Sequence, residues 1–276
     1  MQISAMARNV FRALPVPVAN ALRRLLFPFR NRGLFAPYVI HKDMEGESFE
    51  FLIGDRTGRD WYDRPCINNP RWLEMRFIKE HMAAPGDVIL ECGGHHGCSA
   101  ILLSRWVGAA GSVVTFEPFP ENCDILARNL TLNALTNVTL ERKAVGATDG
   151  HITVEPASSG VDLSGHGRRV PLVRLDDYAH LRPTFLKIDV EGFEVDVLRG
   201  AVALLATCPK LALEIHADLL AQYGASVQDV FDLIGLDRYD TWVQWTDDQQ
   251  PVPFDASITI DHRVHVFCLP RGHRTP

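Results

Sequence analysis

The chain has 276 residues, of which 46% are hydrophobic, 22% charged and 9% aromatic, and its formal net charge is -6. These values are ordinary for a globular protein and exclude the fibrous and disordered classes. The six cysteines include no Cys-x-x-Cys pair, which disfavours a zinc site or a disulfide framework, and no apolar run reaches the roughly 18 residues of a membrane-spanning helix.

The N-terminal segment is basic. Residues 1–42 hold seven Lys or Arg side chains and no acid, whereas the remaining chain holds 21 basic and 34 acidic residues. Its leucine- and phenylalanine-bearing part, Ala21 to Arg30, is suited to an anionic membrane surface; a solvated leader or a helix packed on the catalytic domain is the alternative. We expect residues 1–45 to form this segment and residues 46–276 the catalytic domain. We expect the protein to be located in the cytoplasm. Peripheral contact with the inner membrane surface is an alternative that the sequence leaves open.

Short apolar runs alternate with segments of helical periodicity between Gly86 and His216. This rhythm is typical of parallel β-α-β units, and it predicts a doubly wound α/β fold with helices on both faces of a mostly parallel sheet. Ser99 is placed to cap the helix after the first strand. The expected strands are 87–92, 112–117, 138–145, 185–190 and 211–216, and apolar residues at helical spacing run from Phe193 to Leu205.

Further elements follow outside this alternation. Gly146 to Arg169 is rich in Gly, Ser, Thr and Asp, which predicts a hairpin or loop insertion. A helix is expected over Ser226 to Leu236. The strand-like runs Tyr239 to Trp245 and Arg263 to Leu269 are expected to close the sheet with an antiparallel edge.

A glycine-rich turn, Glu91 to Gly97, follows the first strand and opens a helix. In a doubly wound sheet this place lies at the carboxyl ends of the strands, where ligands bind. Glycines at 93 and 97 let the backbone turn tightly and approach a ligand closely. A dinucleotide fingerprint that starts at Gly93 would need glycine where His95 and Cys98 stand, so a pyrophosphate cofactor is disfavoured. The pattern acid-x-Gly-x-x-x-Gly is instead the one that methyltransferases place around the methionine half of their cofactor.

An acidic residue, Glu117, ends the next strand 20 residues beyond Gly97. A carboxylate at this tip can accept hydrogen bonds from both hydroxyls of a ribose, and a plain surface carboxylate is the alternative. Pro118 and Pro120 then end the strand and begin the next helix.

A longer motif covers the fourth strand and its exit, Leu186 to Gly200, with the core Lys-Ile-Asp-Val-Glu-Gly. Together with Glu117-Pro118, Arg128 to Asn133 and Leu175 to Asp177, it resembles the FkbM family of methyltransferases from about Pro85 to His216. The resemblance implies a seven-stranded Rossmann-like sheet, S-adenosyl-L-methionine as cofactor, and O-methylation of sugars, glycolipids or polyketide-type metabolites.

The cofactor turn departs from the usual family pattern at four positions. Glu91, Gly94, His95 and Cys98 stand where the family usually has Asp, Ala, Asn and an aromatic residue. Glu for Asp is a mild chemical change. His95 alters the size and the proton inventory of the turn, whereas the backbone role of the turn is retained. The expected cofactor-binding set is Glu91, Gly93, Gly94, His95, Gly97 and Glu117.

Acceptor chemistry is expected at the tips of the fourth and fifth strands. Lys187 and Asp189 alternate onto one side of the fourth strand, and Glu191 follows at its exit. We assign Asp189 to positioning of substrate or cofactor and Glu191 to binding of the acceptor hydroxyl. An ion pair of Lys187 with either acid, holding the strand end, is the structural alternative.

The fifth strand carries Glu214 and His216 on one face. Histidine is suited to take a proton near neutral pH, so His216 is the expected general base, and Lys187, Asp189, Glu191 and His216 form the expected catalytic set. No metal is expected, although carboxylates and imidazole at this place also suit Mg or Mn.

The acceptor pocket is expected from residues 46–84 and 217–262, with aromatic side chains that can stack on a sugar or macrocycle or simply pack in the core. The aromatic candidates are Phe35, Tyr38, Trp61, Tyr62, Trp72, Trp242 and Trp245. The expected partner is a small-molecule or glycan acceptor, and the acidic catalytic region disfavours nucleic acid. Two rival functions stay open: a non-catalytic binding or scaffold module with this fold, and a nicotinamide oxidoreductase.

Overall fold

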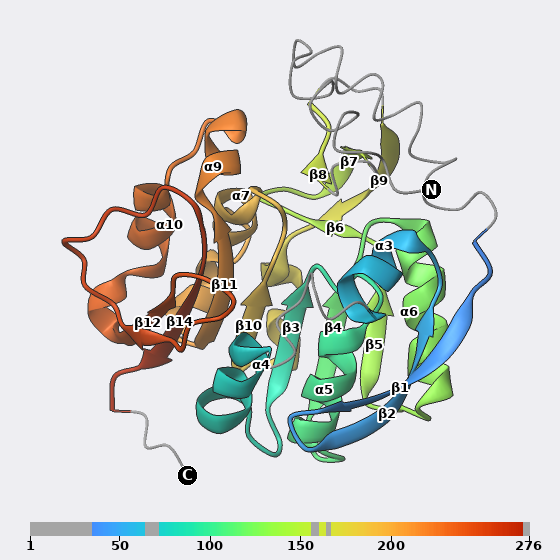
Figure 1. Ribbon diagram of the computed structural model, residues 1–276. Coiled ribbons are helices and arrows are strands. Elements are labelled where there is room, and N and C mark those ends of the chain that lie inside the picture. Colours follow the sequence, from blue (N-terminus) through green and yellow to red (C-terminus); the bar gives the residue numbers. More distant parts are fainter. Residues whose placement is uncertain (1–34, 64–71, 156–159, 164–166, 273–276) are drawn as a thin grey trace, which may run out of the picture.

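The computed structural model describes residues 35–63, 72–155, 160–163 and 167–272. Its secondary structure alternates strands and helices along the chain (Figure 1). The strands are β1 (Tyr38–Met44), β2 (Glu47–Ile53), β3 (Val88–Cys92), β4 (Ser112–Phe116), β5 (Val138–Glu141), β6 (Ala144–Val145), β7 (Gly150–Glu155), β8 (Gly160–Val161), β9 (Arg168–Val173), β10 (Phe185–Ile188), β11 (Lys210–His216), β12 (Tyr239–Gln244), β13 (Val252–Pro253) and β14 (Arg263–Pro270). The helices are α3 (Arg56–Gly58), α4 (Leu73–Phe77), α5 (Cys98–Val107), α6 (Pro120–Leu132), α7 (Glu194–Arg199), α8 (Val202–Ala206), α9 (Ala217–Leu220) and α10 (Val227–Ile234).

One large sheet forms the centre of the molecule, with the strand order β13-β12-β14-β11-β10-β3-β4-β5. The strands from β11 to β5 run parallel, and β14 lies antiparallel between β11 and β12. This is the expected doubly wound, mostly parallel sheet with an antiparallel edge. The two-residue strand β13 adds an eighth member to the seven that were expected.

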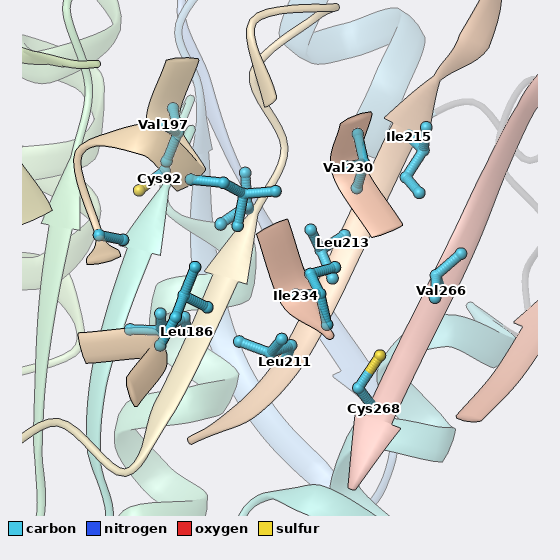
Figure 2. Packing of buried hydrophobic residues seen from close by; sticks show 14 of the residues in the cluster. Cys92, Leu186, Val197, Leu211, Leu213, Ile215, Val230, Ile234, Val266 and Cys268 are labelled. Atoms are coloured by element: carbon cyan, nitrogen blue, oxygen red, sulfur yellow. The ribbon is translucent and has the colours of Figure 1, made fainter. Parts of the chain in front are cut away.

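The sheet is buried on both faces, as its apolar strands predict. One cluster packs against α7, α8 and α10, and Figure 2 shows Leu211, Leu213 and Ile215 of β11 beside Val230 and Ile234 of α10. The opposite cluster packs against α4, α5 and β2. Each fully buried aliphatic side chain contributes roughly 1.5–3 kcal/mol, so this double layer fixes the strands that carry the site.

Several expected elements differ in detail. The run 138–145 divides into β5 of the large sheet and β6 of a second sheet. The helix expected from Phe193 to Leu205 breaks into α7 and α8 around Gly200, where a Cβ would lie 2.0 Å from the Gly146 oxygen. Ser99 does not cap α5, since the N-cap is Gly97 and Ser99 lies within the helix. The N-cap of α10 is Ser226, which forms a capping box with Asp229.

A second, four-stranded sheet has the order β6-β9-β7-β8 and includes the predicted insertion. Figure 1 shows β7, β8 and β9 beyond the carboxyl ends of the parallel strands. The hydroxyl of Tyr223 donates to the Val161 carbonyl at 3.1 Å and ties β8 to the segment after α9. The second sheet therefore covers the edge where ligands bind in this type of fold.

The hairpin β1-β2 was not expected from the sequence, and the division at residue 45 falls in its turn. Residues 1–34, which include most of the basic segment, lie outside the described residues, so its membrane contact stays a prediction. Among the described helices, none has the length and apolar character needed to cross a bilayer. The five described cysteines are free thiols, and Cys66 lies outside the described residues.

Candidate active site

Two adjoining cavities open at the carboxyl edge of the large sheet. We name the first the cofactor cavity, because the glycine turn and Glu117 line it together with residues of β7 and β8. The second, the polar cavity, lies over β10, β11 and β14. Residues shared by both cavities are Trp61, Tyr62, Gly93, His95 and Asp189. A ligand in one cavity therefore meets a ligand in the other beside Asp189.

The glycine turn is shaped by close backbone contacts. Gly93 has φ +93°, and a Cβ there would lie 1.9 Å from the Asp189 carbonyl oxygen. Gly94 has no room either, because a Cβ would meet the Thr115 hydroxyl at 2.2 Å. Gly97 has φ +87° and begins α5. All three expected glycines thus serve the turn, and it is this tight path that keeps the strand tips β3 and β10 together.

The Glu117 carboxylate lies at the tip of β4, where it was expected, and lines the cofactor cavity. It accepts hydrogen bonds from the backbone N–H of His95 at 2.8 Å and of Phe119 at 2.9 Å, and from the Asn122 amide at 3.2 Å. Burial raises its pKa to about 7, against the lowering effect of these donors. The carboxylate therefore clamps the glycine turn to β4 and still faces the cavity.

The His95 side chain lines both cavities and is held by neighbouring rings. Its Nδ1 lies 2.8 Å from the Tyr62 hydroxyl, and its ring stacks on His96 with centroids 4.0 Å apart. Burial and the neighbouring His96 hold the pKa of His95 well below its ordinary value, so the ring is neutral. His95, one of the four residues that depart from the family pattern, is thus a neutral polar side chain that lines both cavities.

Glu91 is fully buried beneath the turn rather than in the lining of either cavity. Among the described residues, its carboxylate oxygens have no hydrogen-bond partner of normal geometry. Burial raises its pKa, and the Lys187 charge opposes this rise. The sequence predicted a direct contact between Glu91 and the cofactor. Because Glu91 lines neither cavity, the structure does not support this contact, although the charge of Glu91 acts on Lys187.

Strand register brings charged side chains into rows on the α4 face of the sheet. Lys187 is paired with Glu91 on β3 and Ala212 on β11. One step further along, Glu214 is paired with His265 on β14, which is paired with Gln244 on β12. Alternate residues of a strand lie on the same face of the sheet. Glu214, His265 and Gln244 form the second row, and all three line the polar cavity.

Lys187 is only 5% exposed, and its ammonium lies 3.6 Å from a Glu74 oxygen and 4.0 Å from an Asp189 oxygen. Burial would lower its pKa, but the charges of Glu74, Asp189 and Glu91 outweigh burial and raise it. Lys187 is therefore charged, and the ion pair that was the structural alternative is present.

Asp189 and Glu191 stand at the exit of β10 with side chains 30% and 35% exposed. Burial and the Glu214 charge raise the pKa of Asp189. Burial raises the pKa of Glu191 to about 7, while His216 opposes it. Both acids line the cofactor cavity.

The His216 imidazole is surrounded by carboxylates. Its Nδ1 lies 2.9 Å from a Glu194 oxygen, and its Nε2 lies 3.4 Å from Glu191 and 3.7 Å from Glu214. Burial would lower its pKa, but the Glu194 hydrogen bond and the neighbouring charges raise it to about 9. The ring therefore carries a proton at neutral pH, which is the wrong state for the general base that the sequence predicted.

The outer wall of the polar cavity is a second ion-pair group. Arg263 bonds Glu214 and lies 2.6 Å from Asp247, and His265 lies 3.5 Å from Asp247 and 3.8 Å from Glu74. Burial would lower the pKa of His265, but Glu74, Glu214 and Asp247 raise it to about 9.

Sequence analysis missed Glu74, Glu194, Gln244 and His265. Gln244 and His265 stand in strand-like runs, so period-two alternation from Glu214 through the antiparallel register could have located them. Glu74 had no such signal. Of the aromatic candidates, Trp61, Tyr62 and Trp72 line the cavities, whereas Phe35, Tyr38, Trp242 and Trp245 pack against the hydrophobic clusters.

Comparison with known proteins identifies the family. A hexuronic acid methyltransferase of Haloferax volcanii, AglP, is 28% identical over 176 residues, which are 60% of this chain and 69% of that protein. Among solved structures, an S-adenosylmethionine-dependent O-methyltransferase of Thermotoga maritima is 15% identical, covers 86% of this chain and 79% of its own, and has a TM-score of 0.42. Aeropyrum pernix fibrillarin with bound S-adenosyl-L-methionine is 14% identical, covers 84% and 94%, and has a TM-score of 0.43. The family model of the methyltransferase FkbM domain matches residues 91–240, more than half of the chain, so the chain belongs to the FkbM family of S-adenosylmethionine-dependent methyltransferases.

Proposed function

We propose that the protein transfers a methyl group to a hydroxyl of a sugar, within a saccharide or glycolipid. The observation that carries this proposal is the meeting of the two cavities at Asp189. The polar cavity has tryptophans at its rim and carboxylates in its wall, and it is continuous with the place expected for the reacting methyl group. Sugars offer both a stacking face and many hydroxyl donors, which suits such a lining.

The residues of the cofactor cavity fit S-adenosyl-L-methionine. Gly93 lines the cavity with backbone alone, which lets the methionine part approach closely, and Glu117 presents a buried carboxylate suited to ribose hydroxyls. Asn122 and Phe119 follow Glu117 in the lining and give the base a polar and an apolar contact. When bound, this cofactor supplies a methyl group on a positively charged sulfur.

The chain's own task is then positioning and removal of a proton. With S-adenosyl-L-methionine bound, the acceptor oxygen would form the new O–CH₃ bond as the methyl–sulfur bond breaks, and Glu191 would take the hydroxyl proton. Glu191 lies in the cofactor-cavity lining, and its carboxylate lies 3.4 Å from the His216 Nε2. Holding the reactants in line is the larger contribution in this type of displacement, and proton removal adds to it.

A hexuronic acid is the acceptor named for the Haloferax relative, and it guides the choice of test acceptors. Purified protein is incubated with methyl-labelled cofactor and three acceptor sets: oligosaccharides that contain uronic acid, matched neutral oligosaccharides, and peptides with free amines. Mass spectrometry should show methylation of a saccharide hydroxyl that Glu191→Gln reduces by about tenfold or more, with unchanged adenosylhomocysteine binding. Methylation of amines alone, or cofactor binding without turnover on any set, would refute the proposal.

A further inference from the structure

We propose that Asp189, Glu214 and His216 form a site for a divalent transition-metal ion, such as Mn²⁺, which holds the acceptor at the junction of the two cavities. The site itself follows from these side chains. Its role toward the acceptor rests on the function proposed above.

The three side chains come from the tips of the adjacent strands β10 and β11. One ligand atom from each can be chosen so that all lie within 4.8 Å of one another, which makes them a potential metal-binding group among the described residues. Ligand atoms at roughly 2.1 Å from one ion lie up to about 4.2 Å apart, so closure needs a shift of less than about 1 Å. Asp189 and Glu214 both line the polar cavity, which gives an ion a path from solvent.

The orientation of His216 suits a metal ligand. Glu194 is fully buried, stands outside the three-residue group, and accepts from His216 Nδ1 at 2.9 Å and from the Gly192 N–H at 2.9 Å. Metal-binding imidazoles usually donate their second N–H to such a carboxylate, which fixes the tautomer and turns the other nitrogen toward the ion. Here that other nitrogen, Nε2, is the atom that faces Glu191 and Glu214.

The ion-pair network around the site has an excess of negative charge. Even with both histidines protonated, six carboxylates face four cationic side chains: Glu74, Asp189, Glu191, Glu194, Glu214 and Asp247 against Lys187, His216, Arg263 and His265. Buried charges need compensation. A divalent ion at the three-residue group would offset part of this negative charge.

A buried polar atom in the polar cavity also lacks a partner. Gln244 is 1% exposed, and its Nε2 donates to the carbonyls of Asp247 and Gln249, which fixes the amide orientation. Its Oε1 has no hydrogen-bond partner among the described residues. A ligand that brings a donor, such as a hydroxyl or a metal-bound water, would satisfy it.

Two cations compete for the same carboxylates, and both have other partners. Arg263 bonds Glu214 but also Asp247, and Lys187 contacts Asp189 but lies closer to Glu74. Arg263 can therefore keep its contact with Asp247, and Lys187 its contact with Glu74, when a metal ion binds. Because the set combines two carboxylates with one imidazole, it favours Mn²⁺ or a similar ion over Ca²⁺ and Mg²⁺, which prefer oxygen ligands alone.

The test is the binding of Mn²⁺ alone to chelator-treated protein, measured by calorimetry and by the electron paramagnetic resonance signal of the free ion. One ion per chain should bind, and Asp189→Asn, Glu214→Gln and His216→Gln should each weaken binding by about tenfold or more. Glu194→Gln should weaken it too, because Glu194 orients His216. The matched control is the exposed pair Asp261 and His262, whose Asp261→Asn and His262→Gln variants should bind Mn²⁺ as the wild type does.

Circular dichroism and thermal unfolding identify the variants that remain folded, and the two carboxylate-to-amide variants keep shape and volume. Absence of Mn²⁺ binding at millimolar concentration, or binding that no ligand variant weakens, would overturn the site. Binding together with full turnover in the presence of a chelator would remove its role toward the acceptor. Since no acceptor is needed for the binding measurement, a wrong sugar assignment would leave the metal result intact.

Discussion

The carbonyl oxygen of Asp189 lies where a side chain on Gly93 would begin, since a Cβ there would be 1.9 Å away. Gly93→Ala should therefore force β3 and β10 apart at the junction of the two cavities. We expect the free energy of unfolding to fall by roughly 3 kcal/mol or more and adenosylhomocysteine binding to be lost. Urea unfolding and calorimetry measure the two effects.

Gly86 provides the matched control for this variant. It has nearly the same backbone angle, φ +89°, but no atom within 4 Å of its ideal Cβ. Gly86→Ala should lower stability by about 1 kcal/mol, the cost of the backbone angle alone, and leave cofactor binding intact. Equal losses from both variants would show that the contact with Asp189 has no effect.

Removal of the Glu117 charge should weaken cofactor binding. Glu117→Gln replaces one acceptor oxygen with an amide, which disturbs the N–H groups of His95 and Phe119 and the expected ribose contacts. We expect adenosylhomocysteine affinity to fall by about 1–3 kcal/mol in calorimetry. Glu121→Gln, at a partly exposed carboxylate paired with Arg168, is the control and should bind normally. Normal affinity in the Glu117 variant would refute the ribose assignment.

Lys187 should matter for stability as well as for the site. Lys187→Met keeps much of the side-chain volume but leaves the buried Glu91 without its cation, and leaves Glu74 with His265, 3.8 Å away, as its neighbouring cation. The free energy of unfolding should fall by about 3 kcal/mol, the usual loss when one partner of a buried pair is removed. Arg142→Met, in a half-exposed pair with Asp124, should change it by less than about 1 kcal/mol. A small loss at Lys187 would mean that its carboxylates accept protons instead.

The His216 charge gives stability a pH dependence in chelator-treated protein. Its pKa is raised from 6.5 to about 9 in the folded state, so the proton favours folding. This contribution is complete below about pH 6 and is lost as pH rises through 9; on the order of 2 kcal/mol is expected over that range. His216→Gln should flatten the unfolding free energy between pH 7 and 9, as measured by urea titration. An unchanged slope in the variant would show that His216 is neutral.

The fold could be predicted because each parallel strand carries an apolar run between helical segments. The runs that became β3, β4, β10 and β11 were confirmed within two residues at either end. The hairpin β1-β2 was missed, since His41, Lys42 and Asp43 interrupt its apolar pattern. The break between α7 and α8 was missed because it depends on a distant contact of Gly200 with Gly146, which no local pattern reports.

For the site, the sequence was sufficient to predict which residues lie at the strand tips, but not the pKa values of these residues. Asp189, Glu191 and His216 do come together at the carboxyl edge. The protonation of His216 could not be predicted, because it depends on Glu194, which the helical start of α7 brings under the ring. Glu91 was expected at the cofactor, but it is fully buried in β3 and lines neither cavity.

Along β11, the odd-numbered and the even-numbered residues lie on opposite faces of the sheet and have different surroundings. Leu211, Leu213 and Ile215 belong to the cluster under α10, whereas Glu214 and His216 stand on the opposite side. Substitutions at Glu214 or His216 therefore alter the polar side of the strand while the apolar packing against α10 stays in place. Insertion of one residue before Glu214 would instead turn Glu214 and His216 toward the apolar cluster and Ile215 toward the polar side, which would disturb both sides at once. The strand therefore tolerates exchange of single polar side chains better than a change in its length.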